Sequence, residues 1–333
     1  MEQFFKILLR HLHTLWSALT TEASCQAAPR GLWQRIECLL FPPIGDPMRP
    51  LVLRDYLTFA LPSIAVCAVV GTWVSPDGLM GYDWRHYFSL GYRTFGTSYY
   101  PPWIVLIAHL GWPLLVGLTL AGLTLALYQR RSTPVKAVSA CLTLPVFWTL
   151  FLGQVDGVAL FGLTGLPWLA PLATIKPQVS YFAFLARKQH LVALIVWLAI
   201  SVIIWGLWPL DMMSITEFVA WQQPHDIHLW PWSLPAVLVM LWFSRGDADM
   251  LMLAGTFAMP YLHPYHYILV VPALARLGQG TAVLAFAISW LPLLSNWYGD
   301  WCWYLGHLFP LLLWSSLFLR RWRSGSRQII LGF

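Results

Sequence analysis

Ionisable and hydrogen-bonding side chains gather in four clusters of an otherwise apolar chain. The first is segment 75–87, in which Asp83 lies between aromatic residues and is followed by Arg85 and His86. A carboxylate in such a loop can act as a general base that takes the proton of an attacking hydroxyl group. It can equally cap a helix beginning at Trp84, because aspartate is a preferred N-cap residue.

The second cluster is the run Gly-Gln-Val-Asp-Gly at 153–157, which contains Gln154 and Asp156. The amide of Gln154 can donate to one sugar hydroxyl and accept from another. The same run is also typical of a polar turn between two helices, with glycine at the bend.

The third cluster surrounds Lys176, where Pro167, Pro171 and Pro177 interrupt an apolar run. Broken helices at membrane depth usually line a cavity, and a lysine there can hold an anionic phosphate. Alternatively, the long side chain of Lys176 extends to the lipid headgroups. The residues alone leave both readings open.

The fourth cluster is the run Pro-Tyr-Leu-His-Pro-Tyr-His-Tyr at 260–267. His263 and His266 are three residues apart, as metal ligands can be, but no clear third ligand accompanies them. Tyrosine and histidine are also ordinary residues at a membrane interface. We therefore predict no metal site and no cofactor, and leave open a divalent cation at the acidic face of the protein.

The elements that position these clusters are predicted to be membrane-spanning helices. The chain is 58% hydrophobic and only 10% charged, which excludes a soluble domain and a nucleic-acid partner. The pattern predicts an all-α, multi-pass membrane protein with about ten crossings. They are expected at residues 51–73, 102–128, 137–152, 157–187, 191–208, 232–243, 250–262, 265–275, 281–294 and 303–319.

Charge gives this topology a direction. With a cytoplasmic N-terminus, seventeen of the twenty Lys and Arg residues fall on the cytoplasmic side, the exceptions being Arg85, Arg93 and Lys176. Such an excess of cations marks cytoplasmic loops. We therefore expect both termini in the cytoplasm and the four clusters at the external face, which is net acidic.

Residues 1–50 precede the first crossing and form a separate region from the transmembrane domain at 51–333. Their apolar residues recur at helical spacing with cations between them, which is typical of amphipathic helices lying on the cytoplasmic leaflet. A docking surface for a membrane-protein partner fits the same pattern. We expect no disulfide within the chain, because most of its cysteines are predicted to face the cytoplasm.

Taken in order, the motifs resemble one family. They are Asp83 with Tyr87, Tyr100-Pro101-Pro102, Gly153 to Asp156, Lys176-Pro177, Arg187-Lys188 and the run from Tyr261 to Tyr267. This order is similar to that in bacterial polyprenyl-phosphate-mannose-dependent alpha-mannosyltransferases, which belong to the GT-C superfamily of integral membrane glycosyltransferases. The resemblance covers about residues 51–276, and the family often has Asn at the position of Asp156.

The resemblance implies a GT-C fold in the bacterial plasma (inner) membrane. It implies an inverting transfer of a hexose, in the first place mannose, from a polyprenyl-phosphate donor to an acceptor on the external face. Asp83 would be the catalytic base. The expected substrate-binding residues are Arg85, His86, Tyr100, Gln154, Asp156, Lys176, His263 and His266. Two alternatives are a non-catalytic GT-C-like subunit of a larger membrane complex and a transporter.

Overall fold

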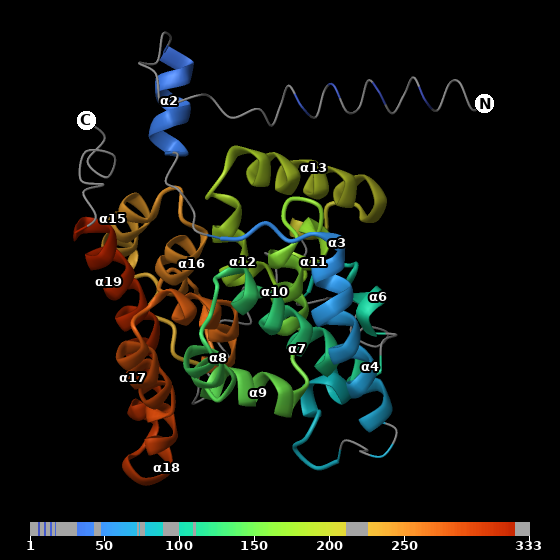
Figure 1. Cartoon of the computed structure of the whole chain (residues 1–333), viewed down its shortest axis with the longest axis vertical. Helices are drawn as coiled ribbons and strands as arrows, with labels where there is room; N and C mark the ends of the chain where they lie inside the picture. The colour runs from blue at the N-terminus through green and yellow to red at the C-terminus, as the bar shows by residue number, and fades with distance from the viewer. Residues whose placement is uncertain are drawn as a thin grey trace.

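The protein is a bundle of helices, shown in Figure 1 as a computed structural model. The structure describes residues 32–42, 48–71, 73, 77–88, 100–108, 111–210 and 226–323, together with residues 6, 10, 14 and 17. These residues form helices and turns, and no strand is found among them. The all-α fold class predicted from the sequence is thus confirmed over the described part of the chain.

Five helical stretches in these ranges are long and apolar enough to cross a membrane, as expected for a membrane-embedded protein. They are Leu53–Val70 (α3 Leu53–Asp55, η1 Tyr56–Ala60 and α4 Leu61–Val70), α7 Trp112–Gln129, α13 Lys188–Trp205, Gln279–Tyr298 (α17 Gln279–Ser289, η6 Leu291–Leu294 and α18 Ser295–Tyr298) and Asp300–Arg323 (η7 Asp300–His307 and α19 Leu308–Arg323). A sixth is possible if α8 Pro134–Cys141 and α9 Leu144–Leu152, which meet at a bend of 49°, form one span.

The other predicted crossings are shorter elements, so ten full spans are not confirmed. They are α10 Asp156–Thr164, α11 Ala170–Ala173, α12 Pro177–Phe184, α15 Leu234–Ser244, α16 Ala248–Thr256 and the 3-10 helices η4 Pro264–Leu269 and η5 Val271–Arg276. Every residue of α16 and of η4 is buried. Because protein rather than lipid surrounds these two elements, neither needs the length of a membrane span.

Helices α7 and α10 pack closely through small residues. A Cβ atom at Gly157 would lie 1.9 Å from Oγ1 of Thr119, and one at Gly122 would lie 2.7 Å from the backbone nitrogen of Phe161. Such contacts let two backbones approach each other, as small residues commonly do between membrane helices. This packing fixes the start of α10, which carries Asp156.

The segment predicted as the fourth crossing reverses twice. The chain runs from Asp156 along α10 to Thr164, returns through 165–175 to Lys176 beside Asp156, and then follows α12 away again. In the returning piece, Ala173 lies against Gly162 of α10. The reversal places the first residue of α10 next to the residue that precedes α12.

The opposite ends of these helices lie where the cations gather, and we call this region the cation end. Here Arg130 pairs with Asp249 at 2.5 Å, and Arg276 pairs with Asp247 at 2.7 Å and with Asp249 at 3.0 Å. Neighbouring backbone carbonyls accept hydrogen bonds from Lys136, Arg245, Arg320 and Arg321. In Figure 1 this end lies at the top, towards α2 and α13, and α9 and α18 lie at the bottom.

Helix α2, Leu32–Leu40, joins the cation end. Glu37 forms an ion pair with Lys188 at 3.2 Å, and Arg245 donates to the carbonyl of Leu39 at 2.6 Å. Most of the amphipathic segment predicted before α2 lies outside the described residues. The expectation that no disulfide forms was wrong, because Cys38 is disulfide-bonded; the sequence argument had assumed a reducing compartment for this region.

Replacing Asp249 with Asn should destabilise the protein by about 3–5 kcal/mol, because two buried arginines would lose a shared counter-ion. Burial opposes ionisation of Asp249, but Arg130 and Arg276 hold its pKa at about 2. This depressed pKa stabilises the fold above the unfolded pKa of about 3.9, and the contribution is lost as pH falls towards 2. Unfolding in detergent measures both effects. The exposed Asp300 provides the control substitution Asp300→Asn, and equal stability of the two variants would contradict the prediction.

Candidate functional site

Asp83 lies in the helical turn at 82–83, just before the π-helix η2 Trp84–Phe88. Its Oδ2 accepts a hydrogen bond from Nε2 of Gln154, which is 71 residues further along the chain. The side chain of Asp83 therefore reaches across to another element. The interpretation of Asp83 as the cap of a helix beginning at Trp84 was wrong, since Asp83 is already helical.

The pKa of Asp83 is raised to about 6. Burial raises the pKa because it disfavours the charged carboxylate, and the negative charge of Asp156 adds to this effect. Lys176, the hydrogen bond from Gln154 and His86 act in the opposite direction. Asp83 thus titrates close to neutral pH, the range in which a carboxylate can both take up and release a proton.

Gly153 positions Gln154. It ends α9 in the left-handed conformation, with φ +73°, and both Gly153 and Gln154 donate their backbone N–H to the carbonyl of Thr149. A Cβ atom at Gly153 would lie 2.9 Å from Cβ of Trp84 and 3.0 Å from Cδ1 of Trp112. The turn and this close contact require glycine. The predicted polar turn is present, and it also delivers Gln154 to Asp83.

Lys176 is buried, with 2% of its side chain exposed. Its Nζ lies 3.5 Å from Oδ2 of Asp156, which is fully buried, and 3.2 Å from the hydroxyl of Tyr100. The same ammonium lies 4.9 Å from the ring centroid of Tyr100 and 5.5 Å from that of Tyr265. The alternative in which Lys176 extends to the lipid headgroups was therefore wrong.

His266 is fully buried in η4. The backbone N–H of His263 donates to its Nδ1 at 2.8 Å, so the neutral ring carries its proton on Nε2. That Nε2 has no hydrogen-bond partner. Nε2 of His263 lies 2.5 Å from the hydroxyl of Tyr261. Because His266 presents a donor, a metal ion could bind its Nε2 only after the ring changed its protonation.

Asp226 holds the run 260–267 in place, a role that has no signal in the sequence. Its Oδ1 accepts from the backbone N–H of Leu262 at 3.1 Å, and Ile227 donates its N–H to the carbonyl of Leu262 at 2.8 Å. On the other side, the hydroxyl of Thr149 donates to the carbonyl of Tyr265 at 3.3 Å. The segment is thus fixed from two directions.

Arg85 and His86 both form hydrogen bonds within their own loop. Arg85 donates to the carbonyl of Gly78, and Nδ1 of His86 lies 2.8 Å from the carbonyl of Tyr82, on whose ring the imidazole stacks. His86 is exposed, and it is near enough to lower the pKa of Asp83. Of the predicted residues, the structure thus groups Asp83, Tyr100, Gln154, Asp156, Lys176, His263 and His266, which we call the carboxylate–lysine cluster.

Four polar atoms of this cluster are buried without a hydrogen-bond partner: Oε1 of Gln154, Oδ1 and Oδ2 of Asp156 and Nε2 of His266. Buried polar groups are normally paired, so unpaired ones at one place are typical of a ligand-binding site. The indole Nε1 of Trp112 beside Gly153 is a fifth such atom, which the sequence analysis missed. In the described part of the chain, no three His, Cys, Asp or Glu residues are grouped as ligands for a metal ion.

Comparison of the chain with family models, with curated proteins and with solved structures finds no match. The carboxylate–lysine cluster is therefore the feature of the protein that bears on its function.

The substitution Gly153→Ala should destabilise the protein by about 1–2 kcal/mol through its left-handed backbone alone, and by more through contact with Trp84 and Trp112. Thermal unfolding of the purified protein measures the loss. Gly78→Ala is the matched control, because Gly78 also has positive φ (+59°) but no atom within 4 Å of the added Cβ. Equal losses in the two variants would show that the contact at Gly153 is unimportant.

Proposed function

We propose that the protein is an inverting membrane glycosyltransferase with Asp83 as its general base. The single observation that supports this best is the hydrogen bond from Gln154 to Asp83 beside the buried charge of Lys176. It places a carboxylate of raised pKa, an ammonium and several unpaired polar atoms in one cluster. The donor in this proposal is a hexose, in the first place mannose, on a polyprenyl phosphate.

In the proposed step, the ionised carboxylate of Asp83 accepts the proton of an acceptor hydroxyl as its oxygen attacks the anomeric carbon. A new C–O bond forms on one face of the sugar while the bond to the phosphate oxygen breaks on the other. The polyprenyl phosphate leaves with the bonding electron pair, so the anomeric configuration inverts. The transition state resembles an oxocarbenium ion, as in inverting glycoside hydrolysis.

Lys176 would stabilise the negative charge that builds on the departing phosphate. Its Nζ is 3.5 Å from Asp156, a separation longer than a good hydrogen bond, so the pair leaves donor capacity on the ammonium. The hydroxyl of Tyr100, at 3.2 Å, lies beside the same ammonium and would line the phosphate site. Asp156 is the buried counter-ion of that ammonium.

The unpaired atoms suit the recognition of a sugar. Oε1 of Gln154 and Oδ1 of Asp156 can accept from hydroxyl groups, and Nε2 of His266 can donate to one. A hexose carries hydroxyls that do both. Substrate binding would thus satisfy groups that are costly to leave buried and unpaired. Arg85, His86 and His263 would border the same site.

We further propose a GT-C-like, multi-pass arrangement in a bacterial plasma membrane, with the cation end and both termini in the cytoplasm. The support is that the described cations of the predicted cytoplasmic loops meet at one end, whereas Asp83 and Lys176 lie away from it. Ten crossings remain our prediction for the whole chain. The disulfide at Cys38 opposes this orientation, because such bonds persist in oxidising compartments.

The alternative is a non-catalytic subunit that docks a partner through residues 1–50. It is favoured by one observation: the charge of Lys176 is already matched by Asp156 and by two aromatic rings, without any substrate. In that case the buried pair would serve the fold alone. Purification with a stoichiometric partner, together with no turnover of a labelled donor, would support the subunit.

Asp83→Asn should lower the transfer of labelled sugar from a polyprenyl-phosphate donor by at least about 100-fold, because the amide cannot accept the proton. The Asn carbonyl can still accept the hydrogen bond from Gln154, so the fold should persist. Asp77→Asn is the control, since Asp77 is an exposed carboxylate in the same loop and bonds to the N–H of Gly78. Full activity of the Asp83 variant in membranes would eliminate this carboxylate as the base.

The transfer rate should rise with pH through about 6 and then level off, because the base must be ionised and the pKa of Asp83 is about 6. Removing the charge in Lys176→Met should move the midpoint to higher pH, since that charge lowers the pKa. Lys176→Arg should keep the midpoint near its original position. Lys136→Met at the cation end is the control, and a midpoint unaffected by Lys176→Met would contradict the assignment.

A further inference from the structure

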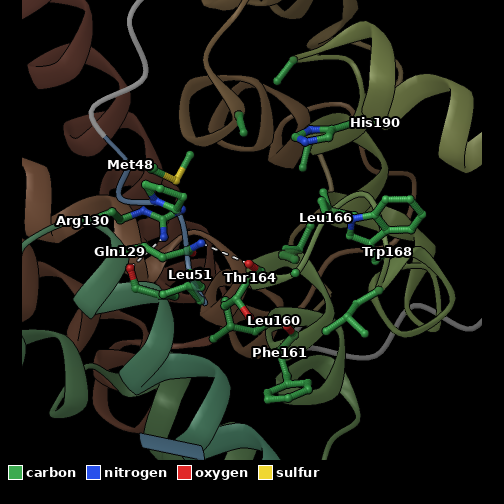
Figure 2. Close-up of a pocket in the computed structure, with 18 of the residues that line it drawn as sticks. Met48, Leu51, Gln129, Arg130, Leu160, Phe161, Thr164, Leu166, Trp168 and His190 are labelled. Carbon is green, nitrogen blue, oxygen red and sulfur yellow. Dashed lines mark hydrogen bonds between the residues drawn. The ribbon is translucent and has the colours of Figure 1, made fainter. Parts of the chain in front are cut away.

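A hollow with a volume of about 830 Å³ lies at the cation end (Figure 2). Its walls come from residues 48–51, the end of α7 at Gln129 and Arg130, the end of α10 with the following turn, and the start of α13. Gln129 donates to the carbonyl of Thr164 at 3.0 Å and ties two of these walls together. We call it the cation-end cavity.

This cavity is separate from the carboxylate–lysine cluster. Helix α7 begins at Trp112, which lies against Gly153 next to the cluster, and it ends at Gln129 in the cavity wall. Its 18 residues correspond to a helix about 27 Å long. Similarly, α10 begins with Asp156 in the cluster and ends with Thr164 in the cavity wall. The two sites therefore lie at opposite ends of the same helices.

The charged residues that line the cavity are all cations among the described residues. Arg49, Arg130 and Arg187 line it, and no carboxylate does among the described lining residues. The acids near the wall have partners of their own: Asp249 is bound to Arg130, Glu37 is bound to Lys188, and Asp55 accepts from the backbone N–H of Val52. Arg49 is stacked over the ring of Tyr128, with its guanidinium carbon 4.6 Å from the centroid. The cavity is thus built to receive an anion.

A polar group that faces this space supports the same conclusion. Nδ1 of His190 is buried and has no hydrogen-bond partner. In Figure 2 the imidazole of His190 lies across the opening from Arg130 and Met48. His190 belongs to the first turn of the 18-residue helix α13, where the helix dipole also favours a negative charge. A phosphate oxygen there would meet cations and a helix N-terminus, and Nδ1 of His190 would donate to it once the ring is protonated on that nitrogen, because the ring already hydrogen-bonds to the backbone of Ala183.

The rest of the wall is apolar and reaches the outside of the protein. Leu160, Leu163, Leu166 and Leu169 line it together with Trp168, whose side chain is 72% exposed. The cavity also lies where two membrane-length helices end, since α7 stops at Gln129 and α13 starts at Lys188. In the proposed membrane topology, the end of α7 would lie at the level of the lipid headgroups, where tryptophan is common. Cations on one wall and exposed apolar residues on another suit an amphiphile.

We propose that the cation-end cavity binds the phosphate headgroup of an anionic lipid. The phosphate contacts Arg49, Arg187 and His190, and the acyl chains leave along Leu166 and Trp168. Clustered basic residues between membrane helices are known to favour anionic headgroups. This inference does not depend on the proposed transferase activity, because none of the residues of the carboxylate–lysine cluster lines the cavity.

Native mass spectrometry of the purified full chain with phosphatidylglycerol, and in parallel with phosphatidylcholine, tests the proposal. We expect one phosphatidylglycerol to be retained and phosphatidylcholine to be retained at least about tenfold less. The double variant Arg49→Gln/Arg187→Gln should weaken phosphatidylglycerol binding by about tenfold or more, the equivalent of about 1.4 kcal/mol. Arg323→Gln is the control, because Arg323 is an exposed cation at the end of α19 and lies outside the cavity wall.

Equal retention of the two lipids, or equal binding by the double variant and the wild-type chain, would overturn the proposal. If inorganic phosphate raises the unfolding temperature as much as phosphatidylglycerol does, the site binds free phosphate and the lipid assignment is wrong. If the double variant does not fold, Arg187→Gln and Arg187→Lys decide instead. Lipid binding retained by the lysine variant and lost by the glutamine variant would support the proposal, and equal binding by the two would overturn it.

Discussion

The structure depends above all on the need to balance one buried ammonium group. Lys176 is 2% exposed, and an unpaired charge at that depth would be too costly to keep. Asp156 supplies the opposite charge and two tyrosine rings supply their faces. Because Asp156 starts α10 and Lys176 precedes α12, the pair can form only if the chain between them reverses. The close glycine contacts of α10 with α7 and with Ala173 make that reversal possible.

The same balance separates the roles of the two carboxylates. Asp156 is fully buried and is the closer counter-ion, so its charge is used to hold Lys176 in place. Asp83 is only half-buried and is bound by the neutral amide of Gln154, which leaves its proton affinity raised. Burial raises the pKa of Asp83 to about 6, and the negative charge of Asp156 adds to this shift, while Lys176 opposes it. We therefore expect the proton transfer at Asp83 rather than at Asp156, which is already paired with Lys176.

Sequence reasoning could predict the composition of the site but not its framework. The polar clusters stand out because polar residues are rare in this chain, and Asp83, Gln154 and Lys176 do meet. The reversal at 165–175 was missed because an apolar run broken by prolines looks the same whether it continues or turns back. The hydrogen bond by which Asp226 holds the run 260–267 was also missed, because its donor, the backbone N–H of Leu262, has no signature in a sequence. The disulfide at Cys38 was excluded by an assumption about the compartment rather than by the residues.

Hydropathy does not distinguish long helices from short buried ones, for a physical reason. An apolar segment can be apolar because it faces lipid or because it packs inside the protein, and the period of the pattern is the same in both cases. The helix Leu53–Val70 is mostly exposed and is long enough to span, whereas α16 is wholly buried and has nine residues. Charge does not share this ambiguity, because a cation needs water, a headgroup or a counter-ion wherever the chain ends up. The pairing of Arg130 and Arg276 with Asp247 and Asp249 shows this need being met at one end of the molecule. In a protein with a buried inner layer, the positions of the cations therefore give a sounder guide to the direction of the chain than the number of its apolar runs.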